Sequence, residues 1–359
     1  MKECRVKDIC IKGSSNLKQK DVEGKKGLYP VYGASGIISS IDTYHQENEY
    51  IAIVKDGSGI GRVSFMPPKS SVIGTMQYIL PKEGYDIRYI GYCLQSLGLN
   101  KYKQGAAIPH IYFRDYGERN IIVTDNINEQ RRIVSYLDSS FKLIDEIKNK
   151  ALKSLTEAKA LFQSALAEAM EPKEGWEEKT LQDVAVFRNG IAHEKSIDNE
   201  KGRFIVVNSK FVSSEGKIMK YCNSQLSPLY EGDIVMVMSD VPNGKALAKC
   251  FIIDNNKKYT LNQRICAFSN HKIDTKYLYF HINRNKYFLE FDNGENQTNL
   301  RKNDILKCPV YFPSIDTQKL IVTHLDKLSS KVQAIEEKYQ KMVEECDALK
   351  QAMLRDVFE

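Results

Sequence analysis

Residues 126–155 read NINEQRRIVSYLDSSFKLIDEIKNKALKSL, and their apolar side chains recur three, four or seven positions apart. This spacing places them on one face of an α-helix, which we predict to run from Asn126 to Met170. Asn126 stands three residues before Glu129, a pattern that is typical of a helix N-terminus. The sequence therefore predicts one long amphipathic helix near the middle of the chain.

The same pattern returns at the end of the chain. Residues 314–358 read SIDTQKLIVTHLDKLSSKVQAIEEKYQKMVEECDALKQAMLRDVF, and the offset is 188 residues, since 318 − 130 (two glutamines) and 325 − 137 (two leucines) agree. A self-similarity at about half the chain length indicates two copies of one module, each a globular part followed by a long helix. Two such helices can bury their apolar stripes only on each other or on a partner. The residues that we expect to pair are Leu137, Ile144, Ile147 and Leu155 in the first helix and Leu325, Val332, Ile335 and Val343 in the second.

The rest of each copy is rich in short β-type runs divided by glycine and proline. In the first copy these runs are 30–38, 50–54, 59–65 and 77–81, with a helix at 86–98; in the second they are 203–208, 232–238, 245–249 and 264–268, with a helix at 275–291. We therefore predict an α+β fold with two mixed sheet-rich domains and an internal repeat. The predicted parts are 1–125, the helix 126–173, 174–313 and the helix 314–359.

Composition sets the outer bounds. The chain has 359 residues, a net charge of +6 and a pI near 8.7, which fits two soluble domains and mildly favours a polyanionic partner. No apolar run approaches the roughly 20 residues that span a bilayer, and the N-terminus lacks the apolar core of a signal peptide. We expect a cytoplasmic protein. The eight cysteines show no zinc-ligand spacing, so we expect reduced, packed side chains and no metal.

Taken together, the chain resembles the DNA-specificity subunits of type I restriction-modification systems. The likeness rests on the order of sheet-rich domain and long helix, twice, and on five motifs: Leu28 to Ile37, the pair Gly105 to Ile111 and Gly294 to Leu300, Asn128 to Val134, Gly175-Trp176, and Gly232 to Ile234. The resemblance implies that each sheet-rich part is a target-recognition domain for half of a bipartite double-stranded DNA sequence. It also implies that the helices pair antiparallel as a coiled-coil spacer with a pseudo-two-fold repeat. It implies partners as well: DNA adenine methyltransferase subunits and, through them, a motor nuclease subunit.

The loops that differ between the copies are the places where recognition is expected, because bidentate side chains read base edges and cations hold phosphates. Lys101, Lys103 and Gln104 flank Tyr102 in a basic, aromatic run. Each of these could equally be a turn residue that satisfies its own backbone. Further candidates at strand ends are Ser35, Lys55, Ser58, Arg62, Thr75 and Gln77 in the first copy, and Arg188, Asn189, Asn208, Lys210, Ser239, Asn243, Lys245, Gln263, Arg264, Gln297 and Thr298 in the second.

Catalytic signatures are missing from the sequence. The run Asp56 to Gly61 is not placed between a strand and a long helix, so it is typical of a hairpin turn and not of a nucleotide loop. No histidine has a partner at zinc-ligand or nucleophile-activating spacing. We therefore expect no cofactor and no catalytic residue, with catalysis supplied by partners. A coiled-coil scaffold that binds only protein, a specificity subunit of a methyltransferase without nuclease, and a hydrolase with a spatially assembled site remain open.

Overall fold

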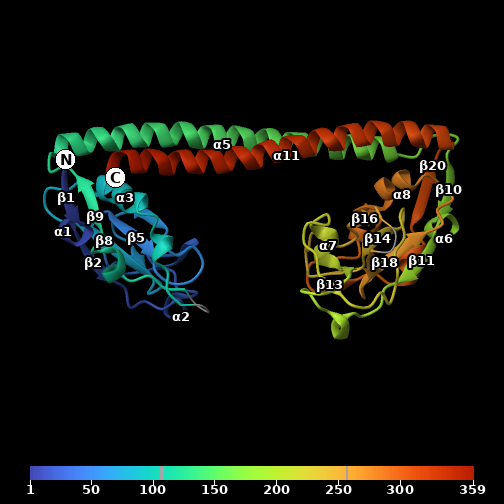
Figure 1. The fold of residues 1–359 in the computed structure, drawn as a ribbon, viewed down its shortest axis with the longest axis horizontal. Coiled ribbons are helices and arrows are strands. Elements are labelled where there is room, and N and C mark those ends of the chain that lie inside the picture. Colours follow the sequence, from blue (N-terminus) through green and yellow to red (C-terminus); the bar gives the residue numbers. More distant parts are fainter. Residues whose placement is uncertain (106–108, 256–257) are drawn as a thin grey trace. The chain divides into compact units, whose positions relative to one another are not determined.

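The computed structural model describes residues 1–105, 109–255 and 258–359. These form two compact units, Met1–Ser154 with Glu336–Glu359, and Leu155–Ile335. Each unit contains one sheet-rich body and one part of each long helix (Figure 1).

The first body lies before the first long helix, α5 (Ile127–Met170). Its elements are β1 (Lys2–Arg5), α1 (Val6–Ile9), β2 (Cys10–Ser14), α2 (Gln19–Val22), β3 (Tyr29–Gly33), β4 (Gly36–Ile41), β5 (Tyr50–Val54), β6 (Val63–Met66), β7 (Ser71–Val72), β8 (Met76–Pro81), α3 (Ile87–Ser96), the 3-10 helix η1 (Leu99–Tyr102), α4 (Phe113–Tyr116) and β9 (Asn120–Val123).

The second body lies between α5 and α11 (Ile315–Phe358). Its elements are β10 (Glu177–Thr180), α6 (Leu181–Val184), β11 (Val186–Asn189), the 3-10 helix η2 (Glu194–Ser196), β12 (Phe204–Val207), α7 (Ser209–Ser213), β13 (Tyr221–Cys222), β14 (Ile234–Val237), β15 (Ser239–Asp240), β16 (Cys250–Ile252), β17 (Tyr259–Leu261), β18 (Ile265–Ser269), α8 (Thr275–Ile282), α9 (Lys286–Leu289), β19 (Thr298–Asn299), α10 (Lys302–Leu306) and β20 (Pro309–Phe312).

The two bodies have the same strand order. Within the described residues, the four-stranded sheet β2-β8-β5-β6 corresponds to β11-β18-β14-β16, and the sheet β4-β3-β7 corresponds to β13-β12-β17. In both three-stranded sheets the central strand pairs antiparallel with one neighbour and parallel with the other. The pair β1-β9 likewise corresponds to β10-β20. The predicted α+β class with two sheet-rich domains and long paired helices is confirmed, whereas the predicted domain boundaries stay predictions.

Two predicted elements are wrong in detail. Residues 245–249 form turns and not a strand, because the Asp240 carboxylate accepts the N–H groups of Ala246 and Leu247 at 2.7 and 3.1 Å. The helix predicted at 275–291 is broken into α8 and α9. The chain leaves the helical conformation at Asn283, which is extended, and Arg284 follows at φ 57°, with its guanidinium donating to the carbonyl of Leu247 at 3.1 Å. A favourable contact of the side chain therefore outweighs local helix propensity here.

The predicted hairpin turn at Asp56 to Gly61 is confirmed. It joins β5 to the antiparallel strand β6, and Gly57, Gly59 and Gly61 all adopt positive φ. A side chain is strained in that region of backbone conformation, which explains the three glycines.

The long helices begin close to the predicted residues. The Asn126 Oδ1 accepts the N–H groups of Asn128 and Glu129 at 3.0 and 3.3 Å, so it caps α5. Glu129 does not close a capping box with Asn126, since its carboxylate accepts the Thr124 hydroxyl at 2.8 Å. At α11 the Ser314 hydroxyl lies 3.1 Å from that of Thr317.

A seam of apolar side chains packs α5 against α11. In the first unit Leu137 and Ile144 are buried, Phe141 is half-buried, and Leu354 and Phe358 face them from α11. In the second unit Leu155 and Leu325 are buried, and Val332 and Ile335 are half-buried. Val343 of α11, which belongs to the first unit, is also half-buried. Positions in the seam alternate by three and four residues, the spacing of a coiled coil.

Lysines occupy two positions of this seam. The next position after Ile144 is Lys148, whose Nζ lies 2.8 Å from Asp347, while Nζ of Lys350 lies 2.6 Å from Asp145. Later residues of α5 thus pair with earlier residues of α11, so the helices run antiparallel in this unit. Ile147 is 50% exposed, and its prediction as a buried pairing residue is wrong because the seam passes through Lys148.

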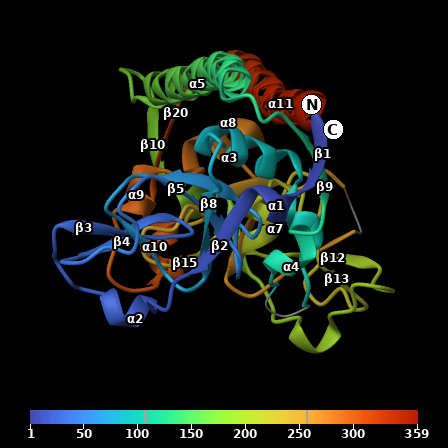
Figure 2. The same ribbon diagram turned by 90° about the vertical axis from the view of Figure 1, so that its left-hand side faces the viewer.

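In the first unit, helix α3 lies between the four-stranded sheet and the helix pair (Figure 2). Its Tyr89, Ile90 and Leu94 are buried in one core with Leu137 of α5, and the ring of Tyr89 lies 5.1 Å from that of Phe358. In the second unit α8 has the same role, with Tyr277 and Leu278 in one core with Leu325. Each sheet-rich body is therefore joined to its long helices through one short helix.

Among the described helices, none is long and apolar enough to cross a membrane. The part of the chain that the structure describes also contains no group of three or more His, Cys, Asp or Glu side chains placed to hold a metal ion.

Candidate nucleic-acid interface

A groove of about 860 Å³ opens on the first sheet-rich body. It lies between β2, the β5–β6 turn and the segment that leads into α4. Its polar and charged lining includes Lys7, Lys12, Asn16, Lys55, Asp56, His110, Tyr112, Arg114 and Glu118.

The segment on one side of the groove is held by backbone pairing. The N–H and carbonyl groups of Gln104 and His110 bond to each other at 2.8 Å, and the N–H of Ile111 donates to Lys55 at 2.9 Å. The His110 Nδ1 also lies 2.6 Å from the Asp56 carboxylate. These contacts fix the positions of Gln104, His110 and Ile111, and Tyr112 to Arg114 follow directly after them.

Tyr112 and Arg114 stand where this segment meets α4. Tyr112 is 44% exposed, and the Arg114 guanidinium lies 4.6 Å from the centre of its ring. The His110 ring stacks on the Tyr112 ring, with ring centres 6.4 Å apart. An exposed ring beside a cation can stack on a base or sugar while the guanidinium holds a phosphate or a guanine edge.

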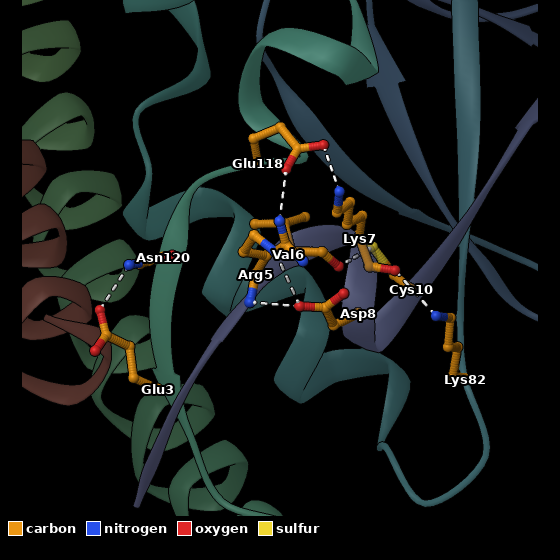
Figure 3. A network of polar contacts seen from close by, with 9 residues as sticks. All are labelled: Glu3, Arg5, Val6, Lys7, Asp8, Cys10, Lys82, Glu118 and Asn120. Atoms are coloured by element: carbon orange, nitrogen blue, oxygen red, sulfur yellow. Dashed lines mark hydrogen bonds and ion pairs between the residues drawn. The ribbon is translucent and has the colours of Figure 1, made fainter.

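The acidic residues of the groove are already paired. Glu118 accepts Nζ of Lys7 at 2.6 Å and Nη1 of Arg5 at 3.2 Å, as Figure 3 shows. The bond from Lys7 holds the pKa of the Glu118 carboxyl below its ordinary value, so this carboxyl stays ionised. Asp56 lies beside His110. Lys12, Lys55 and Arg114 are the further cations that line the groove, and two of them have acidic neighbours: Lys55 Nζ lies 3.8 Å from Asp56, and Arg114 Nε lies 3.7 Å from Asp115.

The predicted DNA-binding residues of the first copy differ in how exposed they are. Ser35, Ser58, Arg62, Thr75, Lys101, Lys103 and Gln104 are exposed. Tyr102 is half-buried, 5.0 Å below the Arg119 guanidinium, and Lys55 lines the groove. Gln77 also borders the groove, but it is 2% exposed and its amide donates to the Tyr116 hydroxyl. This internal bond corrects the prediction that Gln77 is free to contact DNA.

In the second copy several predicted residues are used within the fold. Arg188 pairs with Asp233 at 2.6 Å, and Asn208 caps α7. The Gln297 amide donates to Ser239 at 2.7 Å, and the Thr298 hydroxyl donates to Asp292 at 3.1 Å. These bonds correct the prediction for Arg188, Ser239 and Thr298, which are at most 31% exposed. The residues Asn189, Lys210, Asn243, Lys245, Gln263, Arg264 and Gln297 are exposed.

The two quoted motifs around Gly105 and Gly294 do occupy equivalent places. His110 forms a bridge with Asp56, and Thr298 pairs with Asp240 in the same relation to the preceding strand. Residues 106–108, which belong to the first motif, lie outside the described residues. In each body one described residue of the motif, His110 or Thr298, therefore pairs with the chain just after the central strand β5 or β14.

The sequence did not single out Lys12, Tyr112 or Arg114. Lys12 is one of many lysines in a short strand, and no local signal distinguishes it. The alternation of aromatic and basic side chains in His110-Ile111-Tyr112-Phe113-Arg114 was available as a signal, because such interleaving is typical of nucleic-acid contacts.

The sequence of the chain matches a known protein family. The model of the type I restriction modification DNA specificity domain matches residues 1–157 and 173–345, which is most of the chain. The chain belongs to this family. It is a type I restriction-modification DNA-specificity subunit by family and by fold. A search of curated proteins finds no match.

The chain is also similar to three solved structures. A chain solved for complex assembly and conformational transition of the type I R-M system is 15% identical, with a TM-score of 0.71 over 98% of this chain and 96% of that one. The S subunit from M. genitalium is 15% identical with a TM-score of 0.44, over 100% and 96% of the two chains. The HsdS subunit from Thermoanaerobacter tengcongensis is 15% identical with a TM-score of 0.47, over 98% and 95%. At 15% identity, the similarity with a TM-score of 0.71 shows that the two chains share a fold.

Proposed function

We propose that each sheet-rich body reads one half of a bipartite duplex DNA sequence. The observation that carries this proposal is the repeated strand order with different loops at equivalent edges of the sheets. A repeated frame with altered loops is suited to two different half-sites read in the same way. One small domain can contact only a few base pairs, and each good bidentate contact discriminates by about 1–3 kcal/mol. Two domains therefore multiply the specificity.

In the first body the groove supplies the chemistry. Lys12, Lys55 and Arg114 bind phosphates or guanine, and Tyr112 stacks on a base or sugar. In the second body the exposed Asn243, Lys245 and Gln297 lie on the equivalent loops.

The long helices set the gap between the half-sites and bind the partners. Tyr136, Leu143 and Ile147 of α5 are 57%, 61% and 50% exposed. At about 100° per residue they fall within roughly 40° of one another, and about 100° away from Leu137 in the seam. An apolar face that the described chain leaves exposed is suited to a methyltransferase subunit. That partner supplies adenine methylation, and the motor nuclease joins through the complex.

The test is a salt titration of DNA binding by the chain in complex with its methyltransferase partner. The triple variant Lys12→Gln, Lys55→Gln, Arg114→Gln removes three of the groove cations. Lys338→Gln on α11 is the control for the loss of one charge outside the groove. The slope of log K against log salt should fall by about 0.9 for each lost phosphate contact. The control should leave the slope unchanged.

Two outcomes would contradict the proposal. If the triple variant bound DNA with the slope of the unaltered complex, the groove would not be the interface. If the unaltered complex bound no duplex DNA, the scaffold that binds only protein would be favoured. Methylation without any nuclease partner would instead favour the specificity subunit of a lone methyltransferase.

A further inference from the structure

A set of polar contacts that fixes α3 to α5 returns 188 residues later between α8 and α11. The Oε1 of Gln130, which is fully buried, accepts the N–H of Asp86 at 2.7 Å, and its Nε2 donates to the Thr124 carbonyl at 2.9 Å. In the second unit Gln318 is 2% exposed and accepts the N–H of Asp274 at 2.9 Å. Its amide donates to Pro313 at 2.8 Å.

Both aspartates cap the short helices. Asp86 accepts the N–H groups of Arg88 and Tyr89, and Asp274 accepts that of Tyr277. The buried glutamine of each long helix thus holds the N-cap residue of the short helix. We call the contacts of Asp86, Gln130, Arg88, Tyr92 and Asp138 the first latch. The contacts of Asp274, Gln318, Lys276 and Asp326 are the second latch.

The ionic part of the two latches differs. In the first, Asp138 accepts Nε and Nη2 of Arg88 at 3.2 and 2.5 Å, and also the hydroxyl of Tyr92. The Arg88 guanidinium lies 4.7 Å from the centre of the Phe65 ring in the sheet. Burial raises the pKa of Tyr92 to about 12, so its hydroxyl remains a donor to Asp138 at neutral pH.

The second latch keeps a single ionic contact. Within the described chain, Asp326 accepts Nζ of Lys276 at 2.5 Å. Phe280 stands at the position equivalent to Tyr92 and has no hydroxyl to donate. The Lys276 side chain is also more exposed than that of Arg88, 55% against 42%.

These differences matter for geometry. A planar guanidinium that bonds a carboxylate through two nitrogens fixes the angle between the two groups as well as their distance. An ammonium on a flexible stem fixes only the distance. The first short helix is therefore held in orientation, and the second is held mainly in position.

We propose that the two recognition domains are held on their long helices with unequal rigidity. The first latch fixes the orientation of the first domain, whereas the second latch leaves the second domain freer to rotate on α11. The tolerance of the protein for a DNA gap one base pair too long or too short then comes from the second domain. This consequence rests on the proposed reading of two half-sites.

The latches themselves are tested by hydrogen exchange on the full chain, without DNA. Protection factors of α3 should exceed those of α8 by about tenfold or more, which is the scale of the additional charge-assisted hydrogen bonds. The pair Arg88→Lys, Tyr92→Phe should bring α3 to the level of α8, and Lys276→Arg should raise the protection of α8. Arg5→Lys, which changes an ion pair with Glu118 outside the latch, is the matched control and should change neither helix. Equal protection of α3 and α8 in the unaltered chain would overturn the inference.

The effect on recognition is tested with the methyltransferase complex and duplexes whose gap is native, one base pair longer or one shorter. Arg88→Lys, Tyr92→Phe should reduce the preference for the native gap several-fold, and Lys276→Arg should increase it. The effect of a mismatch inside a half-site should stay the same, because no recognition loop is altered. Affinity that fell equally for all three gaps would show a merely structural role and overturn the proposal. An unaltered complex that bound no DNA would refute the proposed function, and hydrogen exchange alone would then decide the latches.

Discussion

Replacing Gln130 by methionine tests whether the buried glutamine joins the first sheet-rich body to α5. Methionine keeps the length of the side chain but removes three hydrogen bonds, from the Asp86 N–H and to the carbonyls of Gly84 and Thr124. Each buried group left unpaired costs about 1–3 kcal/mol, and the three share one side chain, so their effects do not simply add. We expect a loss of about 3 kcal/mol in the free energy of unfolding of the first unit.

Gln318→Met is the equivalent change in the second unit. Two partners lose their bonds there, the Asp274 N–H and the Pro313 carbonyl, so the same reasoning gives about 2 kcal/mol. The two units can be followed separately in denaturant. Trp176 is the only tryptophan, and its ring lies 6.4 Å from Tyr277 of α8, so its fluorescence reports the second unit. Far-ultraviolet circular dichroism reports both units.

Gln130→Met should therefore shift the circular dichroism transition more than the fluorescence transition, and Gln318→Met should shift the fluorescence transition. Gln340→Met on the exposed face of α11 is the control, and it should change stability by no more than about 0.5 kcal/mol. If Gln130→Met behaved like this control, the hydrogen bonds of Gln130 would not hold the domain, and the reasoning would be refuted.

Three further predictions concern the helices and the second unit. Replacing Lys148 and Lys350 by leucine should raise the free energy of unfolding by about 1–2 kcal/mol each. Their partners Asp347 and Asp145 are 61% and 55% exposed and therefore remain hydrated. A lower midpoint of unfolding in urea would contradict this prediction. Four residues inserted after Ala158 lengthen the helix by about 6 Å and should lengthen the recognised gap by one or two base pairs. Two inserted residues should instead destabilise the helix pair. An unaltered gap in methylation maps would mean that something else positions the domains. Burial lowers the pKa of His281, so the unfolded state takes up the proton first, and the second unit should lose stability as pH falls below about 6.5. His281→Gln should weaken this pH dependence of stability in fluorescence-monitored unfolding. An unchanged pH dependence would contradict this role of His281.

Sequence reasoning succeeded where a pattern is long and regular. The offset between Gln130 and Gln318 predicted the duplicated module, and the structure shows that both glutamines make the same contact. It failed where a single side chain decides. The alternating pattern at 245–249 looks like a strand, but Asp240 binds those N–H groups and bends the chain. The candidate site could be only partly predicted, because the groove joins β2, the β5–β6 turn and α4, whose proximity no local pattern reveals.

The most direct measurement of the central claim is a map of methylated adenines in DNA from cells that express the chain with its methyltransferase partner. The map is compared with one from a chain whose residues 1–125 come from a related subunit. We predict that one half of the recognised sequence changes, while the other half and the gap between them stay the same. A replacement that altered both halves, or neither, would contradict modular reading of a bipartite site.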